Sequence, residues 1–135
     1  VAIPGASNYF KGGIISYTSE VKEDLLQVSH ETLEAQTAVC EDVARQMALG
    51  AIKALNVDFA VSVTGVAGPG GGTPDIPVGT IWIACGTKDN IRTLKLENDF
   101  GRDINLAIAT NKALRLLLQV VTERLNEDEE NEKNP

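Results

Sequence analysis

The sequence predicts an α/β domain in three layers (α/β/α), with a mixed β-sheet covered on both faces by helices. Segments with helical spacing of apolar residues alternate with short β-branched segments along most of the chain. Two of the β-branched segments adjoin a turn and read as a hairpin. The 135 residues are 43% hydrophobic, which is enough for one core. Alternation of this kind is typical of layered α/β domains.

The first part of the chain contains one predicted strand and three predicted helices. Residues 12–18 are β-branched and aromatic and follow glycines, which indicates a strand. Ser19 can cap a helix over residues 20–27, and a short helix is predicted over residues 30–36. Residues 40–55 repeat apolar side chains, mostly alanine, at helical spacing. Such a helix can pack closely onto its neighbour.

The second part contains three predicted strands and one long helix. Residues 58–64 are almost continuously apolar, which favours a buried strand. Residues 78–87 and 91–97 are predicted to form an antiparallel hairpin around a turn at residues 88–90. A final helix is predicted over residues 102–125.

This final helix is apolar on more than one face, although only one face can cover its own sheet. The predicted surplus includes Leu106, Leu116 and Val120. A surplus apolar face usually marks an interaction surface, so we expect a homo-oligomer that buries these side chains.

The net charge of −7 is concentrated at the C-terminus. Residues 127–135 carry net −4, so we expect a domain over residues 1–126 followed by an acidic, disordered tail. An acidic chain without a basic stripe is a poor candidate for binding nucleic acid. No apolar run approaches the roughly 20 residues of a membrane span, so we expect no membrane partner.

Cysteine and histidine usage argues against a metal site. Cys40 and Cys85 lie far apart and form no CxxC pair, which favours small buried thiols in a reducing, cytoplasmic environment. His30 is the only histidine, so neither a metal nor a metal-dependent cofactor is expected. The chain begins at Val1 rather than methionine, so we expect the natural protein to be longer or processed.

A glycine-rich stretch directly follows the predicted buried strand. Residues 64–72 contain five glycines and one proline, which lets the backbone turn sharply and approach a ligand closely. Successive N–H groups in such a loop can bind phosphate or another anion. No Gly-Lys-Ser/Thr follows, so it is not a P-loop. A connecting turn that needs glycine only for its φ angles is an equally good interpretation.

Tyr17 and Lys22 form a second candidate site. They lie near the end of a predicted strand and in the first turn of the next helix, so their side chains could converge. A nearby ammonium lowers the pKa of a phenol, and the phenolate could act as a general base. Packing of the tyrosine ring beside an unrelated lysine is the alternative. Arg102, at the start of the last helix, could bind phosphate or carboxylate, or lie at the surface.

Together these segments resemble the C-terminal domain of the CinA family. Residues 4–13 and 17–22 are similar to the early part of that domain, and residues 38–48 are similar to its central helix. Residues 64–72 and 77–80 are similar to its glycine-rich loop and following strand. The resemblance covers nearly all of residues 1–125.

The resemblance implies an enzyme that hydrolyses the carboxamide of nicotinamide mononucleotide to nicotinic acid mononucleotide and ammonia, without a cofactor. It implies that a serine attacks the amide and that Tyr17 and Lys22 activate it, at a cavity shared with the loop. Arg102 would bind substrate, although Gly101-Arg102-Asp103 departs from the family's Gly-Asp-Arg order. The implied substrate-binding residues of the loop are Thr64, Gly65, Ala67, Gly68, Pro69 and Gly70.

The family's nucleophile lies in a Glu-Ser-x-Thr-Gly-Gly motif on an initial strand and helix, and no residue of this sequence matches it. We therefore expect the fold to lack that first strand and helix, and the 135-residue chain to be inactive by itself. The alternative is a non-catalytic nucleotide-binding or assembly module of the same fold.

Overall fold

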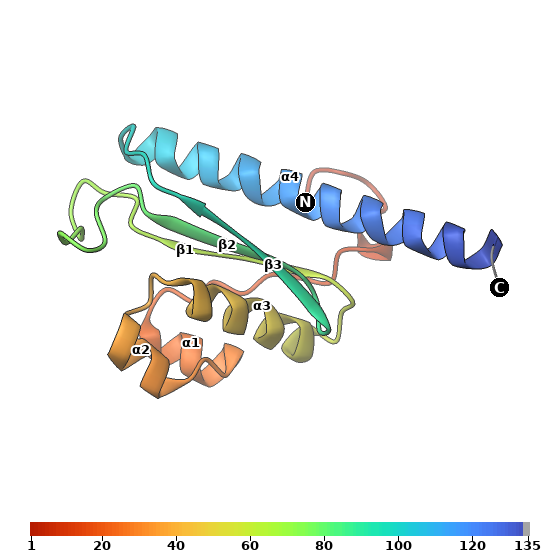
Figure 1. Ribbon diagram of the computed structural model, residues 1–135, viewed down its shortest axis with the longest axis horizontal. Coiled ribbons are helices and arrows are strands. Elements are labelled where there is room, and N and C mark those ends of the chain that lie inside the picture. The colour runs from red at the N-terminus through yellow and green to blue at the C-terminus, as the bar shows by residue number, and fades with distance from the viewer. Residues whose placement is uncertain (134–135) are drawn as a thin grey trace.

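Helices cover both faces of a small sheet in residues 1–133, the part of the chain that the computed structural model describes. In chain order the elements are a 3-10 helix (Ala6–Asn8), α1 (Ser19–Leu26), α2 (His30–Gln36), α3 (Glu41–Leu55), β1 (Ala60–Gly65), β2 (Ile81–Thr87), β3 (Asn90–Leu96) and α4 (Arg102–Lys133). Figure 1 shows α4 on one face of the sheet and α3 on the other, with α1 and α2 beyond α3. The predicted three-layer α/β/α class is confirmed.

The three described strands lie in the order β1-β2-β3, and both pairs are antiparallel. The predicted hairpin is confirmed with a tighter turn, because Thr87 pairs with Asn90 across Lys88 and Asp89. A two-residue connection suits the twist of antiparallel strands. No parallel pair occurs among the described strands, so the mixed character expected of the sheet is not found within residues 1–133.

The core is divided by the sheet. On one face, Ile81, Ile83 and Cys85 of β2 pack against α4. On the other face, Ala44 and Ala48 of α3 pack against Ala84 of β2, and all three are completely buried. The small side chains let α3 approach the sheet closely, as the alanine-rich sequence predicts.

The strand predicted over residues 12–18 is wrong. Residues 11–17 pair with none of the three described strands. β-branched residues favour an extended backbone, but a strand also needs a neighbour for its hydrogen bonds. Burial still alternates along the segment: Ile14 packs against the α1–α3 cluster, whereas Ile15 and Tyr17 are exposed. Thr18, not Ser19, caps α1 by accepting a hydrogen bond from the N–H of Val21 at 3.2 Å.

The last helix is longer than predicted, because α4 continues through Lys133. Residues 127–133, for which the sequence predicts a disordered tail, are thus helical in this structure, and residues 134–135 lie outside the described part. An Arg124–Asp128 pair at i,i+4 spacing supports the added turns, and extending a helix costs far less than nucleating one. Figure 1 shows the final turns of α4 projecting past the sheet.

By length and composition, α4 could cross a membrane: its most apolar 18-residue window has a mean hydropathy of 1.2. Length and composition alone are weak evidence for a span, because the core helices of other proteins share them.

Candidate functional site

The glycine-rich stretch forms a folded loop between β1 and β2. The N–H of Val66 donates to the Thr80 carbonyl at 2.9 Å, and the N–H of Gly79 donates to the Val66 carbonyl at 2.8 Å, which closes the base of the loop. Gly68 has a φ of +86°, and a Cβ there would lie 2.4 Å from Cγ1 of Val78. Glycine is therefore required at this position both by the backbone angle and by the packing.

Two side chains at the start of α4 hold this loop. Arg102 Nη1 donates to the Gly68 carbonyl at 2.8 Å. Asn105 Nδ2 donates to the Ala67 carbonyl at 3.0 Å. The structure thus places Arg102 at the loop, where its guanidinium binds the loop's own backbone.

Asn105 is a residue that sequence reasoning missed. Its side chain is almost fully buried, and its Oδ1 accepts from the N–H of Phe100 at 2.8 Å. Its Nδ2 also donates to Asp99 Oδ1 at 2.9 Å, which lowers the pKa of Asp99, and the N–H of Gly101 adds to the effect. The sequence could have indicated this burial, because Asn105 has the helical spacing of Ala109 and Ala113, which face the sheet. A polar residue in a buried register usually has a fixed set of partners.

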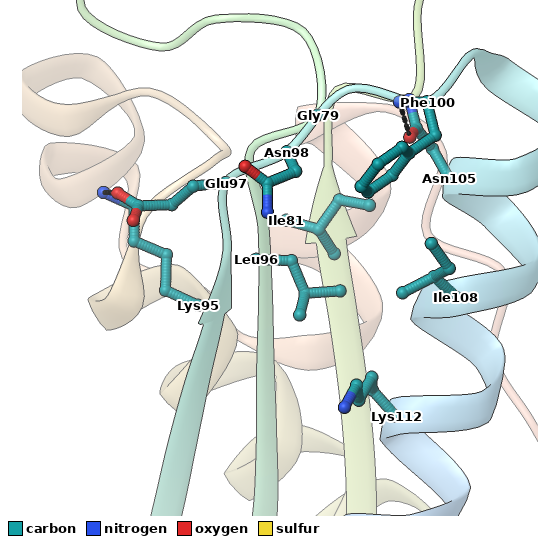
Figure 2. A pocket seen from close by; sticks show the side chains of 10 residues that line it. All are labelled: Gly79, Ile81, Lys95, Leu96, Glu97, Asn98, Phe100, Asn105, Ile108 and Lys112. Atoms are coloured by element: carbon teal, nitrogen blue, oxygen red, sulfur yellow. Dashed lines mark hydrogen bonds and ion pairs between the residues drawn. The ribbon is translucent and has the colours of Figure 1, made fainter.

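A cavity of about 360 Å³ lies beside these residues, between α4 and the ends of β2 and β3. Figure 2 shows apolar side chains of Ile81, Leu96 and Ile108 in its middle and Asn105 bonded to Phe100 at its upper edge. Lys95 lies on its rim, where it pairs with Glu97 at 3.0 Å. The cavity reaches the base of the loop through Gly79.

The lysine of the predicted catalytic pair is buried on the opposite side of the sheet. Lys22 of α1 is 6% exposed, and its Nζ donates to the Ser16 carbonyl at 2.6 Å. Burial lowers the pKa of Lys22, because the ammonium has lost water. A lysine with a lowered pKa can supply a neutral amine closer to neutral pH, as catalytic lysines do.

The tyrosine of that pair, Tyr17, lies at the surface and not beside the cavity. Tyr17 directly follows the carbonyl that Lys22 contacts, but its side chain is 89% exposed. Neither residue lines the 360 Å³ cavity, and neither does any residue of the stretch 64–72. Thr64 nevertheless connects the loop to the α1 side of the sheet, because its Oγ1 donates to the Ala38 carbonyl, between α2 and α3, at 2.8 Å.

Among residues 1–133, no cluster of three His, Cys, Asp or Glu side chains could hold a metal ion. Burial raises the pKa of the Cys85 thiol to about 11, although Arg92 opposes the rise, so the thiolate is disfavoured. His30 bridges two helices instead, contacting Glu23 at 2.7 Å and Glu34 at 2.9 Å. The candidate functional groups among the described residues are therefore the Lys22 amine and the backbone of the glycine-rich loop.

Comparison with known proteins gives consistent matches. The family model of the CinA C-terminal domain matches residues 1–121. A CinA-like protein of Leptospira borgpetersenii is 51% identical over 87 residues, 64% of this chain and 21% of the relative. A CinA-like protein of Thermosynechococcus vestitus is 44% identical over 118 residues, 85% of this chain and 28% of the relative. The chain thus spans 21% to 28% of the length of these relatives.

Solved structures match over most of the chain. The competence/damage inducible protein CihA from Agrobacterium tumefaciens has a TM-score of 0.81 and 39% identity, covering 87% of this chain and 73% of that protein. The competence damage-inducible protein A from Klebsiella pneumoniae has a TM-score of 0.84 and 29% identity, covering 90% of this chain and 75% of that protein.

Proposed function

Because the chain belongs to the CinA C-terminal domain family, we propose that this protein hydrolyses the carboxamide of nicotinamide mononucleotide. Water replaces the amide nitrogen, which leaves as ammonia, and the other product is nicotinic acid mononucleotide. The protein would act on this small nucleotide in the cytoplasm, without a metal or cofactor. The observation that carries the proposal is the buried Lys22 amine, held at the end of the segment that leads to Tyr17.

Lys22 is suited to proton transfer because burial lowers the pKa of its amine. The ammonium has exchanged water for the Ser16 carbonyl, and the loss of water lowers its pKa. An amine of this kind can accept the proton of an attacking hydroxyl, directly or through Tyr17. The family resemblance assigns the attack to a serine in a Glu-Ser-x-Thr-Gly-Gly motif, which has no counterpart among residues 1–135.

The glycine-rich loop is proposed to bind the substrate. Residues 70–72 are exposed, whereas the loop base is fixed by Asn105 and by Arg102. A backbone held in this way can present N–H groups to a phosphate without losing much entropy on binding. Arg102 would then act mainly by holding the loop.

Ammonia release with nicotinamide mononucleotide tests the proposal. The 135-residue chain should bind the nucleotide weakly and release no ammonia above background, because the serine oxygen is required for acyl transfer. A form extended upstream by the serine motif should release ammonia. In that form Lys22→Ala should abolish turnover, whereas Lys88→Ala, in the exposed hairpin turn, should leave it unchanged.

The outcomes separate the candidate functions. Rapid turnover by the short chain would show that the nucleophile has been misplaced. An extended form that binds the nucleotide but releases no ammonia would indicate the non-catalytic nucleotide-binding or assembly module instead.

A further inference from the structure

The long helix α4 does not cover the sheet evenly. Leu116 and Val120, which the sequence predicts to be surplus, pack against the sheet in the hydrophobic core, so that part of the prediction is wrong. Nearer its start, α4 leaves the cavity of about 360 Å³ between itself and the ends of β2 and β3. Ligand pockets have volumes of about 300–1,000 Å³, so this cavity has room for a small molecule.

The cavity is separate from the groups to which the proposed function assigns chemistry. Neither Tyr17 nor Lys22 lines it, and no residue of the stretch 64–72 does. Lys22 lies on the other side of the sheet, where its amine donates to the Ser16 carbonyl. A ligand in this cavity would therefore occupy a second site, and its binding does not depend on the proposed function.

The middle of the cavity is an apolar surface with an exposed aromatic ring. Ile81 is 4% exposed and forms the floor, and the half-buried Leu96 and Ile108 lie beside it. Phe100 also lines the cavity, although its side chain is 55% exposed. Figure 2 shows the Phe100 ring on the side of Ile81 that is nearer to Asn105. An exposed phenyl ring beside aliphatic side chains offers a face on which a second aromatic ring can stack.

The charged side chains of the lining leave one positive charge without a partner. Lys95 pairs with Glu97 at 3.0 Å, and its ammonium also lies 5.5 Å from the centroid of the Trp82 ring. Lys112 lines the cavity too, and nothing within residues 1–133 bonds or pairs with its amine. Two lysines against one glutamate give the lining a net charge of +1, in a chain whose net charge is −7. An unpaired ammonium at the edge of an apolar cavity favours an anionic ligand.

The two ends of the cavity differ in charge, which selects the orientation of such a ligand. Figure 2 shows Lys112 at one end and Asn105 at the other. The Asp99 carboxylate belongs to the asparagine end, where its Oδ1 accepts from Asn105 Nδ2 at 2.9 Å and from the N–H of Gly101 at 3.0 Å. Asp99 repels an anionic group at that end, so the anionic group belongs at the Lys112 end.

We propose that this cavity binds a small aromatic carboxylate, with its ring on Ile81 and Phe100 and its carboxylate beside Lys112. The ring removes apolar surface from water, and the carboxylate forms a charge-assisted hydrogen bond with the ammonium. Because Lys112 is exposed, the ion pair contributes less to the affinity than the ring does.

Titration of the 135-residue chain with 2-naphthoate, followed by amide NMR shifts, tests the proposal. The shifts should saturate with a dissociation constant on the order of 1 mM and should be largest in residues 95–112. Neutral 2-naphthamide is the matched ligand. It has the same ring system without the charge, so it should bind about three- to fivefold more weakly.

Variants separate the contribution of the charge from that of the ring. Lys112→Gln should bind the two ligands equally, because it removes the ammonium and keeps most of the side chain. Lys88→Gln, in the exposed turn at the opposite end of β2 and β3, is the matched control and should keep the preference for naphthoate. Phe100→Ala should weaken both ligands about three- to tenfold. It retains the backbone N–H that donates to Asn105.

Several results would overturn the proposal. They are shifts that do not saturate by about 10 mM ligand, equal affinity of wild-type chain for the two ligands, and a preference for naphthoate that survives Lys112→Gln. Unchanged affinity in Phe100→Ala would overturn it as well. Nicotinamide mononucleotide should not displace naphthoate, because no residue of the stretch 64–72 lines the cavity. Displacement would place both molecules at one site and would contradict a second site.

Discussion

Replacing Asn105 with alanine should loosen the glycine-rich loop and destabilise the whole domain. The change removes three hydrogen bonds, those to Phe100, Ala67 and Asp99. The two backbone partners lose their only side-chain partner at this site, whereas exposed Asp99 can turn to water and contributes little. Each of these two part-buried backbone groups contributes about 1–2 kcal/mol when the loss of its partner leaves it unpaired. We therefore expect about 2–4 kcal/mol less free energy of unfolding.

For a chain of this size the loss corresponds to a fall in Tm on the order of 10 °C. Thermal unfolding followed by circular dichroism measures it, and amide hydrogen exchange should quicken in residues 66–72. Asn126→Ala is the matched control, because Asn126 lies exposed on the same helix and the same substitution there should change stability by less than about 0.5 kcal/mol. A variant at Asn105 that melts with wild type, or that melts early with exchange in the loop unchanged, would refute this account of Asn105.

Three further predictions concern single side chains. His30 should titrate above its usual pKa of 6.5, because Glu23 accepts a hydrogen bond from the ring and adds its charge. The stabilisation of the fold by protonated His30 is complete below pH 6.5 and is lost as pH rises through the folded pKa. The C2 proton signal of this single histidine reports its pKa by NMR, and a value below 6.5 would contradict the prediction. Cys85 should resist a thiol reagent at pH 8 while Cys40 reacts, because burial raises the pKa of Cys85 to about 11; equal labelling of both in folded chain argues against this burial. Gly50→Ala should lower the free energy of unfolding by about 1–3 kcal/mol in urea, since its Cβ would lie 1.9 Å from a backbone oxygen of α1; an unchanged midpoint would mean that α1 can move away freely.

Much of the local structure follows from the sequence, because its causes act over a few residues. The helix over residues 30–36 and the helix ending at Leu55 match the predicted bounds closely, since apolar spacing and capping residues are visible in the chain. The hairpin follows from two β-branched segments around a short polar turn. The glycine-rich loop was likewise visible as a loop, since glycine and proline restrict local conformation directly.

Tertiary structure alone decides the rest, because it depends on partners far away in the chain. Residues 12–18 have strand composition, yet a strand also requires a neighbour, and no described strand runs beside them. The sequence around Lys22 does not show that this lysine is buried. Only the folded chain places its amine against the Ser16 carbonyl and away from water. Asn105 becomes a structural centre of the loop only because α4 packs with that residue toward residue 67, 38 positions away. Burial and hydrogen bonding over such separations are set by how the layers pack, which local composition does not record.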